Sequence, residues 1–229
     1  MKNLFLRGLV GFIFFNYFLF SQVEEIYKLD LENQKQTKLE FEVELKEGEE
    51  LVFFPVFLGP GLCACKFTIE GLKIKCLEDG KVYQLPEGWR GKEEGSSENN
   101  PLIVDGKPLW RLDRIWAIDG NWKDVEKRVE NYIPMIWGIR MAGEGWYAPE
   151  EQSHGGQPSA SVKGGNIVLT SRTAWPGKAG NKFSALIFIV PKKGKYSIEG
   201  MVNTKIFDGG TKIGLKLLKK EPSKKIKGE

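Results

Sequence analysis

The chain has 229 residues, of which 34 are Lys or Arg and 30 are Asp or Glu, giving a formal net charge of +4 at pH 7. This length, with 41% hydrophobic residues, is enough to bury a sizeable core. The Lys-rich C-terminal end has no interleaved aromatic residues of the kind that stack on bases, so the composition disfavours a nucleic-acid partner.

The first 21 residues have the pattern of an export signal. Lys2 and Arg7 form a short basic start, and the uncharged, mostly apolar run 8–20 follows. This run of 13 residues is shorter than the ~18 needed to span a bilayer and fits a signal-peptide core. We therefore expect residues 1–21 to be a signal peptide, and the protein to be secreted, periplasmic or held at the cell surface.

The expected cleavage site follows Ser21, which places a small residue before the cut. Leu19, two positions earlier, departs from the usual small residue, so the alternative is an uncleaved anchor and a membrane contact through that anchor alone. Cleavage would leave 208 of the 229 residues, with 32 Lys or Arg against 30 Asp or Glu.

The N-terminal region, residues 22–88, is predicted to be β. Residues 39–45 alternate between apolar residues and glutamates, which is typical of a strand with one face in the core. The apolar run 51–58 predicts a strand buried on both faces, and Pro55 places an edge or a bulge there because it lacks an N–H. Further strands are predicted at 67–69, 72–76 and 81–85, the last after a turn at 79–80.

Three cysteines, Cys63, Cys65 and Cys76, lie within this region. Export permits a disulfide, and the odd number leaves one thiol over. We expect Cys76 to pair with Cys63 or Cys65 across a local loop. The alternative is a zinc site with His154, but the C-x-C spacing is tighter than zinc ligands usually have. We therefore predict no metal site and no cofactor.

Residues 89–107 are polar and rich in turn formers, which predicts a linker or a long exposed loop. They form the best internal boundary. Either two β regions, 22–88 and 108–220, are separate, or both belong to a single sandwich with this segment as an insertion.

One short helix is predicted near residues 122–132. Trp122, Val125 and Val129 recur at helical spacing with charged residues between them, and Pro134 ends the pattern. Residues 150–165 are then expected to be a second long loop.

The C-terminal part has strand patterns at 166–171, 183–190, 195–203 and 212–218, joined by Gly-containing turns. Short strands without alternating helices predict a mainly β protein with an antiparallel β-sandwich. Residues 221–229 are expected to be a flexible basic tail.

The run 186–200 (LIFIVPKKGKYSIEG) combines an apolar strand ending in Pro, a Gly turn and a return strand beginning Tyr-x-Ile. This pattern resembles carbohydrate-binding-module-like, jelly-roll β-sandwich domains of exported bacterial proteins, and the resemblance extends roughly over residues 130–218. It implies a jelly-roll-like fold and binding of a polysaccharide or cell-surface glycan.

Sugar binding needs flat aromatic faces with polar groups at their edges. The candidates on or beside predicted loops are Trp137, Trp146, Tyr147 and Trp175. The alternative for each is burial, because large aromatic side chains also fill the core of a β-sandwich. We expect at least one of the loop tryptophans to be exposed.

The sequence offers no catalytic constellation. His154 is the only histidine, and no Gly-x-Ser-x-Gly elbow occurs. A glycosidase needs two carboxylates flanking a bond, and the Trp-rich region offers Asp113, Asp119 and Glu144 without fixing their separation in space. We therefore predict a non-catalytic binding module. The alternatives are an extracellular adhesion or structural protein with a protein partner and, less favoured, a glycan-cleaving enzyme.

Overall fold

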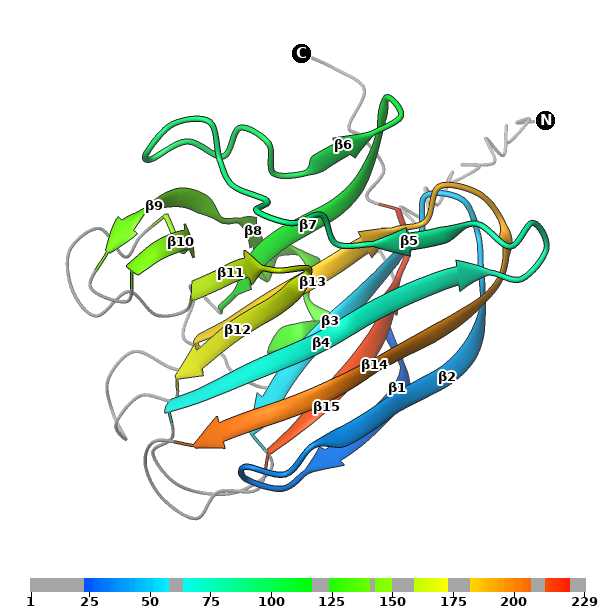
Figure 1. Cartoon of the computed structure of the whole chain (residues 1–229), viewed down its shortest axis with the longest axis horizontal. Helices are drawn as coiled ribbons and strands as arrows, with labels where there is room; N and C mark the ends of the chain where they lie inside the picture. Colours follow the sequence, from blue (N-terminus) through cyan, green and yellow to red (C-terminus); the bar gives the residue numbers. More distant parts are fainter. Residues whose placement is uncertain are drawn as a thin grey trace, which may run out of the picture.

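A computed structural model of the chain describes residues 23–57, 64–116, 124–140, 143–149, 159–172, 182–206 and 213–222. The predicted export signal, Cys63, Asp119, Trp122, His154 and Trp175 lie outside these ranges. The mainly β, antiparallel architecture expected from the sequence is confirmed (Figure 1). The strands are β1 Val23–Leu31, β2 Thr37–Leu45, β3 Glu50–Phe57, β4 Ala64–Cys76, β5 Val82–Gln84, β6 Leu102–Val104, β7 Lys107–Ile115, β8 Tyr132–Pro134, β9 Ile136–Arg140, β10 Gly143–Tyr147, β11 Ser159–Lys163, β12 Asn166–Arg172, β13 Lys182–Ile189, β14 Gly194–Ile206 and β15 Ile213–Lys220.

The strands form one antiparallel sheet with two arms. One arm runs β2–β14–β4–β12–β11–β10–β9, and Figure 1 shows its first four strands side by side. The other arm runs β1–β15–β3–β13–β7, with β6 and β8 on β7. The arms are joined where β12 pairs with β13, and the sheet curls on itself until it is nearly closed.

The two ends of the chain meet in this sheet. β1 pairs with β15 from Val23 opposite Lys220 to Leu31 opposite Ile213. β2 pairs with β14, and β3 pairs with both β13 and β15. Four strands from residues 22–88, β1 to β4, are therefore each hydrogen-bonded to strands from residues 108–220.

The residue patterns explain the burial of these strands. In β2, Leu39 and Leu45 are buried while the glutamates between them face solvent, as the alternation predicts. β3 is buried on both faces, because Phe53 packs into the main core and Phe54 into a second apolar cluster. Pro55 lies opposite Leu215 of β15, beyond the end of the pairing with β13, so its missing N–H breaks no bond on that side.

The helix predicted near 122–132 does not form among the described residues. Two short 3₁₀ turns, η1 Val125–Lys127 and η2 Val129–Asn131, stand in its place, separated by Arg128 in an extended conformation (φ −98°, ψ 110°). The following residues pair with β7 as β8, and Val125 and Tyr132 cover the second apolar cluster. Strand pairing and burial of these side chains override the helical periodicity.

The prediction of a disulfide between Cys65 and Cys76 is wrong. Both residues lie in β4, at its two ends, and eleven residues of extended strand span about 36 Å. A disulfide requires Cα atoms roughly 4.4–6.8 Å apart. Both sulfur atoms are buried, and the Cys76 thiol donates to Glu78 Oε2 at 3.0 Å. No disulfide joins two residues in the described part of the chain.

The segment 89–107 is fixed to the sheet. It contributes β6, and Trp89 and Asn100 are buried. The Asn100 amide donates to the carbonyls of Leu112 (2.7 Å) and Met135 (3.0 Å), and its Oδ1 accepts from the Leu112 N–H (2.9 Å). Within the ranges that the structure describes, no helix is long and apolar enough to cross a membrane.

Candidate functional site

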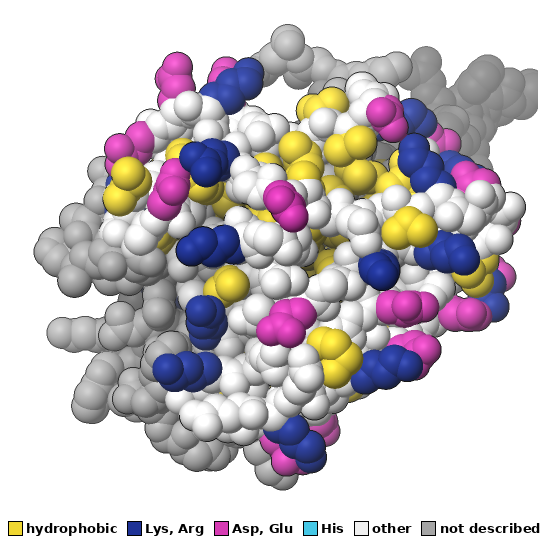
Figure 2. Space-filling model, in the orientation of Figure 1, with side chains coloured by type: hydrophobic (Ala, Val, Ile, Leu, Met, Phe, Trp, Pro, Cys, Tyr) yellow, Lys and Arg dark blue, Asp and Glu magenta, His cyan; other side chains and the backbone are white. Residues whose placement is uncertain are grey.

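An open groove of ≈ 850 Å³ lies on the outer face of β4, β12 and β11. One wall is residues 87–90 and the other is the β9–β10 hairpin. Figure 2 shows charged side chains of both signs around apolar ones on this face of the molecule. The groove is lined by Lys66, Glu87, Gly88, Trp89, Arg90, Trp137, Gly143, Glu144, Ser159, Ser161, Val162, Lys163, Gly164, Val168 and Thr170.

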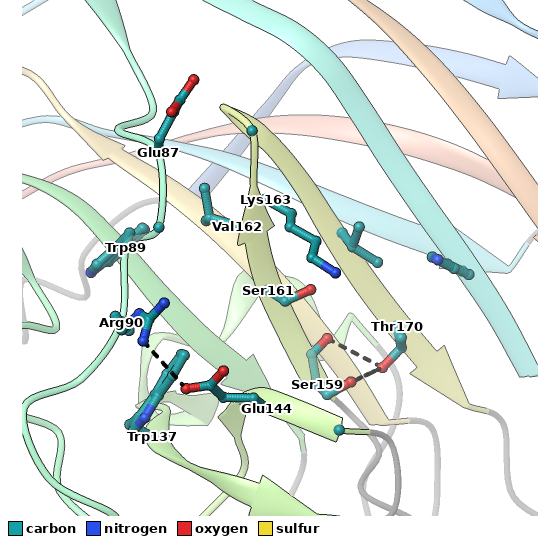
Figure 3. A pocket seen from close by; sticks show the side chains of 15 residues that line it. Glu87, Trp89, Arg90, Trp137, Glu144, Ser159, Ser161, Val162, Lys163 and Thr170 are labelled. Atoms are coloured by element: carbon teal, nitrogen blue, oxygen red, sulfur yellow. Dashed lines mark hydrogen bonds and ion pairs between the residues drawn. The ribbon is translucent and has the colours of Figure 1, made fainter.

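The floor is a polar row set by strand register. Thr170 of β12 lies opposite Lys66 of β4, and Ser161 of β11 lies opposite Val168. The Thr170 hydroxyl accepts from the Ser159 N–H at 2.8 Å and lies 2.9 Å from the Ser159 hydroxyl (Figure 3). The floor therefore offers hydroxyl groups and the cations of Lys66 and Lys163 on a rigid strand surface. Residues 159–163, expected as part of a loop, form β11.

Trp137 of β9 is the aromatic residue of the groove that is not fully buried. Its ring packs edge-on against Trp146, with centroids 5.3 Å apart and an interplanar angle of 69°. Trp146 packs in turn against Trp89 (5.8 Å) and directs its indole N–H to the Trp89 carbonyl (3.4 Å). Three tryptophans thus join the two walls of the groove.

Trp146 and Tyr147, predicted as ligand-binding residues, are 0% and 2% exposed, so neither offers a ring face to solvent. Trp146 packs in the main core beside Trp137. The Tyr147 hydroxyl donates to the Gly143 carbonyl of the same strand, β10, and burial raises the pKa of Tyr147, with Arg140 offsetting part of the rise. Both residues position the wall rather than face the groove. Trp175 lies outside the described residues.

Gly91 fixes the position of Trp137. A Cβ at Gly91 would lie 2.2 Å from the Trp137 Cβ, so only glycine allows the loop to approach so closely. The same loop pairs with the Trp137 backbone, through Trp137 N–H to the Ser96 carbonyl (2.9 Å) and Gly95 N–H to the Trp137 carbonyl (2.7 Å). The sequence prediction missed this contribution of segment 89–107. Trp89, a large apolar residue in a polar stretch, was the signal for it.

Charges are unevenly paired in the groove. Arg90 and Glu144 face each other across the two walls at 3.7 Å (Figure 3). Lys66, Lys163 and Glu87 also line the groove, and none of them has an ion-pair partner among the described residues. Figure 3 shows the Glu87 carboxylate and the Lys163 ammonium pointing in opposite directions.

The two carboxylates considered for catalysis that the structure describes, Asp113 and Glu144, are not brought together. Glu144 lines the groove, whereas Asp113 lies in β7 of the other arm, is 1% exposed and forms an ion pair with Arg111 at 2.9 Å. Burial raises the pKa of Asp113, and Arg111 offsets only part of that rise. In the described ranges, no group of three or more His, Cys, Asp or Glu residues could hold a metal ion.

Comparison with known proteins finds no family model, no curated protein and no solved structure that matches this chain. What the groove does must therefore be inferred from its own geometry and chemistry.

Proposed function

We propose that this protein is an exported, non-catalytic binding module whose ligand is a carbohydrate chain, such as a polysaccharide or a cell-surface glycan. The observation that carries the proposal is the open groove, in which the partly exposed Trp137 ring stands beside hydroxyl and charged side chains. Sugar rings combine C–H faces, which pack on an indole, with hydroxyl edges, which need polar partners.

The rigidity of the groove supports this assignment. Trp137 is held from behind by Trp146 and from the side by Gly91, so little conformational freedom remains to be lost when a ligand packs on it. Ser159 and Thr170 lie on neighbouring strands, which fixes the hydroxyls of the floor in the same way. A pre-organised surface of this kind suits a weakly hydrophobic ligand such as a sugar.

We extend the proposal to the type of β fold and to the location of the protein outside the cytoplasm. We infer that the nearly closed sheet is a flattened, jelly-roll-like sandwich, because the main core joins residues of both arms, such as Phe67 of β4 and Phe188 of β13. The groove then lies on the outside of one layer. The proposal that the protein is exported is supported by the basic start and apolar run of residues 1–21.

A binding assay on insoluble polysaccharides tests the function. We expect the purified chain to be retained on at least one glycan, and Trp137→Ala to lose about tenfold or more in affinity because the stacking surface is removed. Trp116→Ala is the matched control, since Trp116 is also half-buried but follows β7, away from the groove. The proposal would be contradicted if no glycan retained the chain, or if Trp137→Ala bound as tightly as the wild type.

The enzymatic alternative is tested with the same panel. We expect no soluble sugar to be released, because Asp113 is buried in the other arm, and Glu144 and Glu87 lie on opposite walls of the groove with Glu144 paired to Arg90. Release that disappears in Glu144→Gln would make the protein a glycan-cleaving enzyme instead.

A second candidate, an adhesion or assembly module, is favoured by apolar side chains on β5 and β6. Val82 and Ile103 are 47% and 53% exposed, and the neighbouring turns are tied together by an ion pair between Lys81 and Asp105 (3.3 Å). Sedimentation of the wild-type chain against Ile103→Glu decides this. Self-association that is lost in the variant would favour assembly over sugar binding.

A further inference from the structure

The groove that we propose to bind carbohydrate has a charge pattern that selects among glycans. We propose that its ligand is an anionic glycan chain, carrying carboxylate or sulfate groups that pair with Lys66 and Lys163. This inference rests on the proposed function and specifies its class of ligand.

The first step is the pairing of charges. Three cations, Lys66, Arg90 and Lys163, and two carboxylates, Glu87 and Glu144, line the groove. Arg90 and Glu144 satisfy each other across the walls. The two lysines of the floor are exposed and have no ion-pair partner in the described part of the chain. They are available to an acidic ligand without first breaking an internal pair.

The second step is a comparison with other described lysines. Several of them have an acidic partner close at hand: Lys195 with Glu42, Lys192 with Asp79 and Lys216 with Glu126. Lys73 and Lys75 of β4, outside the groove, have no ion-pair partner among the described residues, so they match the groove lysines in pairing and differ from them in position. Glu87, the unpaired carboxylate of the groove, points away from Lys163 (Figure 3). The floor is therefore locally positive although the chain carries nearly balanced charge.

The third step is the spacing of the two cations. Lys66 lies opposite Thr170 on one side of β12, whereas Lys163 lies on its other side, opposite Asn166, which precedes Thr170 by four residues. Ideal sheet geometry separates these positions by about 13 Å along the strands and about 10 Å across them. A single sugar does not reach both lysines, so a chain of several units with repeated acid groups fits the floor.

The fourth step is the place of Trp137 and of the hydroxyl pair Ser159–Thr170. They lie in the same groove as the lysines, so a sugar ring on the indole would carry the chain over the floor. The lysines then contribute the choice between acidic and neutral chains, because charge complementarity adds selectivity to a surface that already binds. Attraction between exposed charges is screened by salt, so this selectivity weakens as ionic strength rises.

The test compares matched acidic and neutral probes by calorimetry on the full chain. One pair is a hexamer of galacturonic acid and its fully methyl-esterified form, and the other is a sulfated dextran oligomer and the unmodified oligomer. We expect one acidic probe to bind about tenfold more tightly than its neutral partner at low salt. Which acidic probe binds separates a carboxylate ligand from a sulfate ligand.

The variants assign the effect to the floor. The double variant Lys66→Gln/Lys163→Gln should bind the acidic probe about tenfold more weakly than the wild type, because two exposed ion pairs with the ligand are lost. Most of the preference for the acidic over the neutral probe should then disappear. The double variant Lys73→Gln/Lys75→Gln is the control. Both lysines are exposed residues of β4 outside the groove, and this variant changes the net charge by as much as the groove variant does. We expect the control to bind within twofold of the wild type.

Equal binding of acidic and neutral probes, or an unchanged preference in the groove variant, overturns the anionic assignment while leaving sugar binding intact. An equal loss in the control variant also overturns it, because net charge alone would then explain the preference. If none of these probes and no polysaccharide of the wider panel binds, the proposed function itself fails.

Discussion

Glu50 shows how one residue ties three strands together. It lies at the start of β3, accepts two hydrogen bonds from Arg111 of β7 (2.9 and 3.0 Å) and one from Lys220 of β15 (2.6 Å). Burial alone would raise the pKa of Glu50, but Arg111 and Lys220 outweigh it and hold the pKa below its ordinary value. The carboxylate is thus stabilised in its charged form inside the sheet.

We predict that Glu50→Gln lowers the free energy of unfolding by about 3 kcal/mol or more, because it removes the buried carboxylate that pairs with both Lys220 and Arg111. A lowered pKa in the folded state contributes stability above the unfolded pKa, and this is lost as pH falls through the folded value. Wild-type stability should therefore fall towards acid pH more steeply than that of Glu50→Gln. Urea unfolding at neutral and acid pH measures both effects.

Asp113→Asn provides the contrast for this prediction. Because burial raises the pKa of Asp113, protonation of this residue favours the folded state as pH falls. Removing it should make the acid loss of stability steeper than in the wild type. Parallel pH profiles for wild type and Glu50→Gln would contradict the assigned role of Glu50.

At the scale of the residue, the sequence predicted which residue type a binding site would use better than it predicted which of these residues are exposed. It placed Trp137 among the sugar-binding candidates, and this residue lines the groove. It equally proposed Trp146 and Tyr147, which are buried, because a tryptophan beside a turn has the same sequence signature whether its ring points inward or outward. Only the packing of β9 and β10 separates these two outcomes.

The β11–β12 hairpin illustrates the element scale. Its two-residue turn, Gly164-Gly165, has positive φ at both positions (+56° and +73°), the conformation expected of the tightest hairpin turns. This turn sets the register that places Lys163 and Ser161 on the floor of the groove. The sequence prediction treated the segment before the turn as a loop, because residues 159–163 lack strong apolar alternation.

We predict that Gly165→Ala destabilises the protein by about 1–2 kcal/mol, because an L-residue with a Cβ is strained in the left-handed region. Gly164→Asn should cost much less, since asparagine tolerates this conformation at the first turn position. Thermal unfolding of both variants measures the difference. An equal loss for the two would show that side-chain clashes, rather than backbone strain, dominate at this turn.

At the scale of the whole molecule, the first and last described strands close one sheet. β15 lies between β1 and β3, so most stabilising contacts join residues far apart in the chain. Contacts of this kind make folding slow, because the entropy of loop closure is lost before they form. They also couple residues 22–88 to residues 108–220.

We therefore predict a single cooperative unfolding transition in urea. Far-ultraviolet circular dichroism, which follows the strands, and tryptophan fluorescence, which follows the Trp-rich half, should give the same midpoint. Two separated transitions would mean that residues 22–88 and 108–220 unfold as independent domains.

The sequence by itself determined the class of fold. The alternation in β2 and the continuous apolar run of β3 record which faces are buried, because side chains of a strand point to opposite faces with a period of two residues. These patterns are local, and so they survive in any arrangement of the strands.

Only the tertiary structure decided the features that depend on strand pairing. It separated Cys65 from Cys76 by placing both on one long strand, replaced the predicted helix by 3₁₀ turns beside β7, and packed Trp89 of the expected linker against Trp146. The groove exists because residues 87–90, β9–β10 and β11–β12 meet in space, and the hydrogen bonds and packing that join them link residues tens of positions apart.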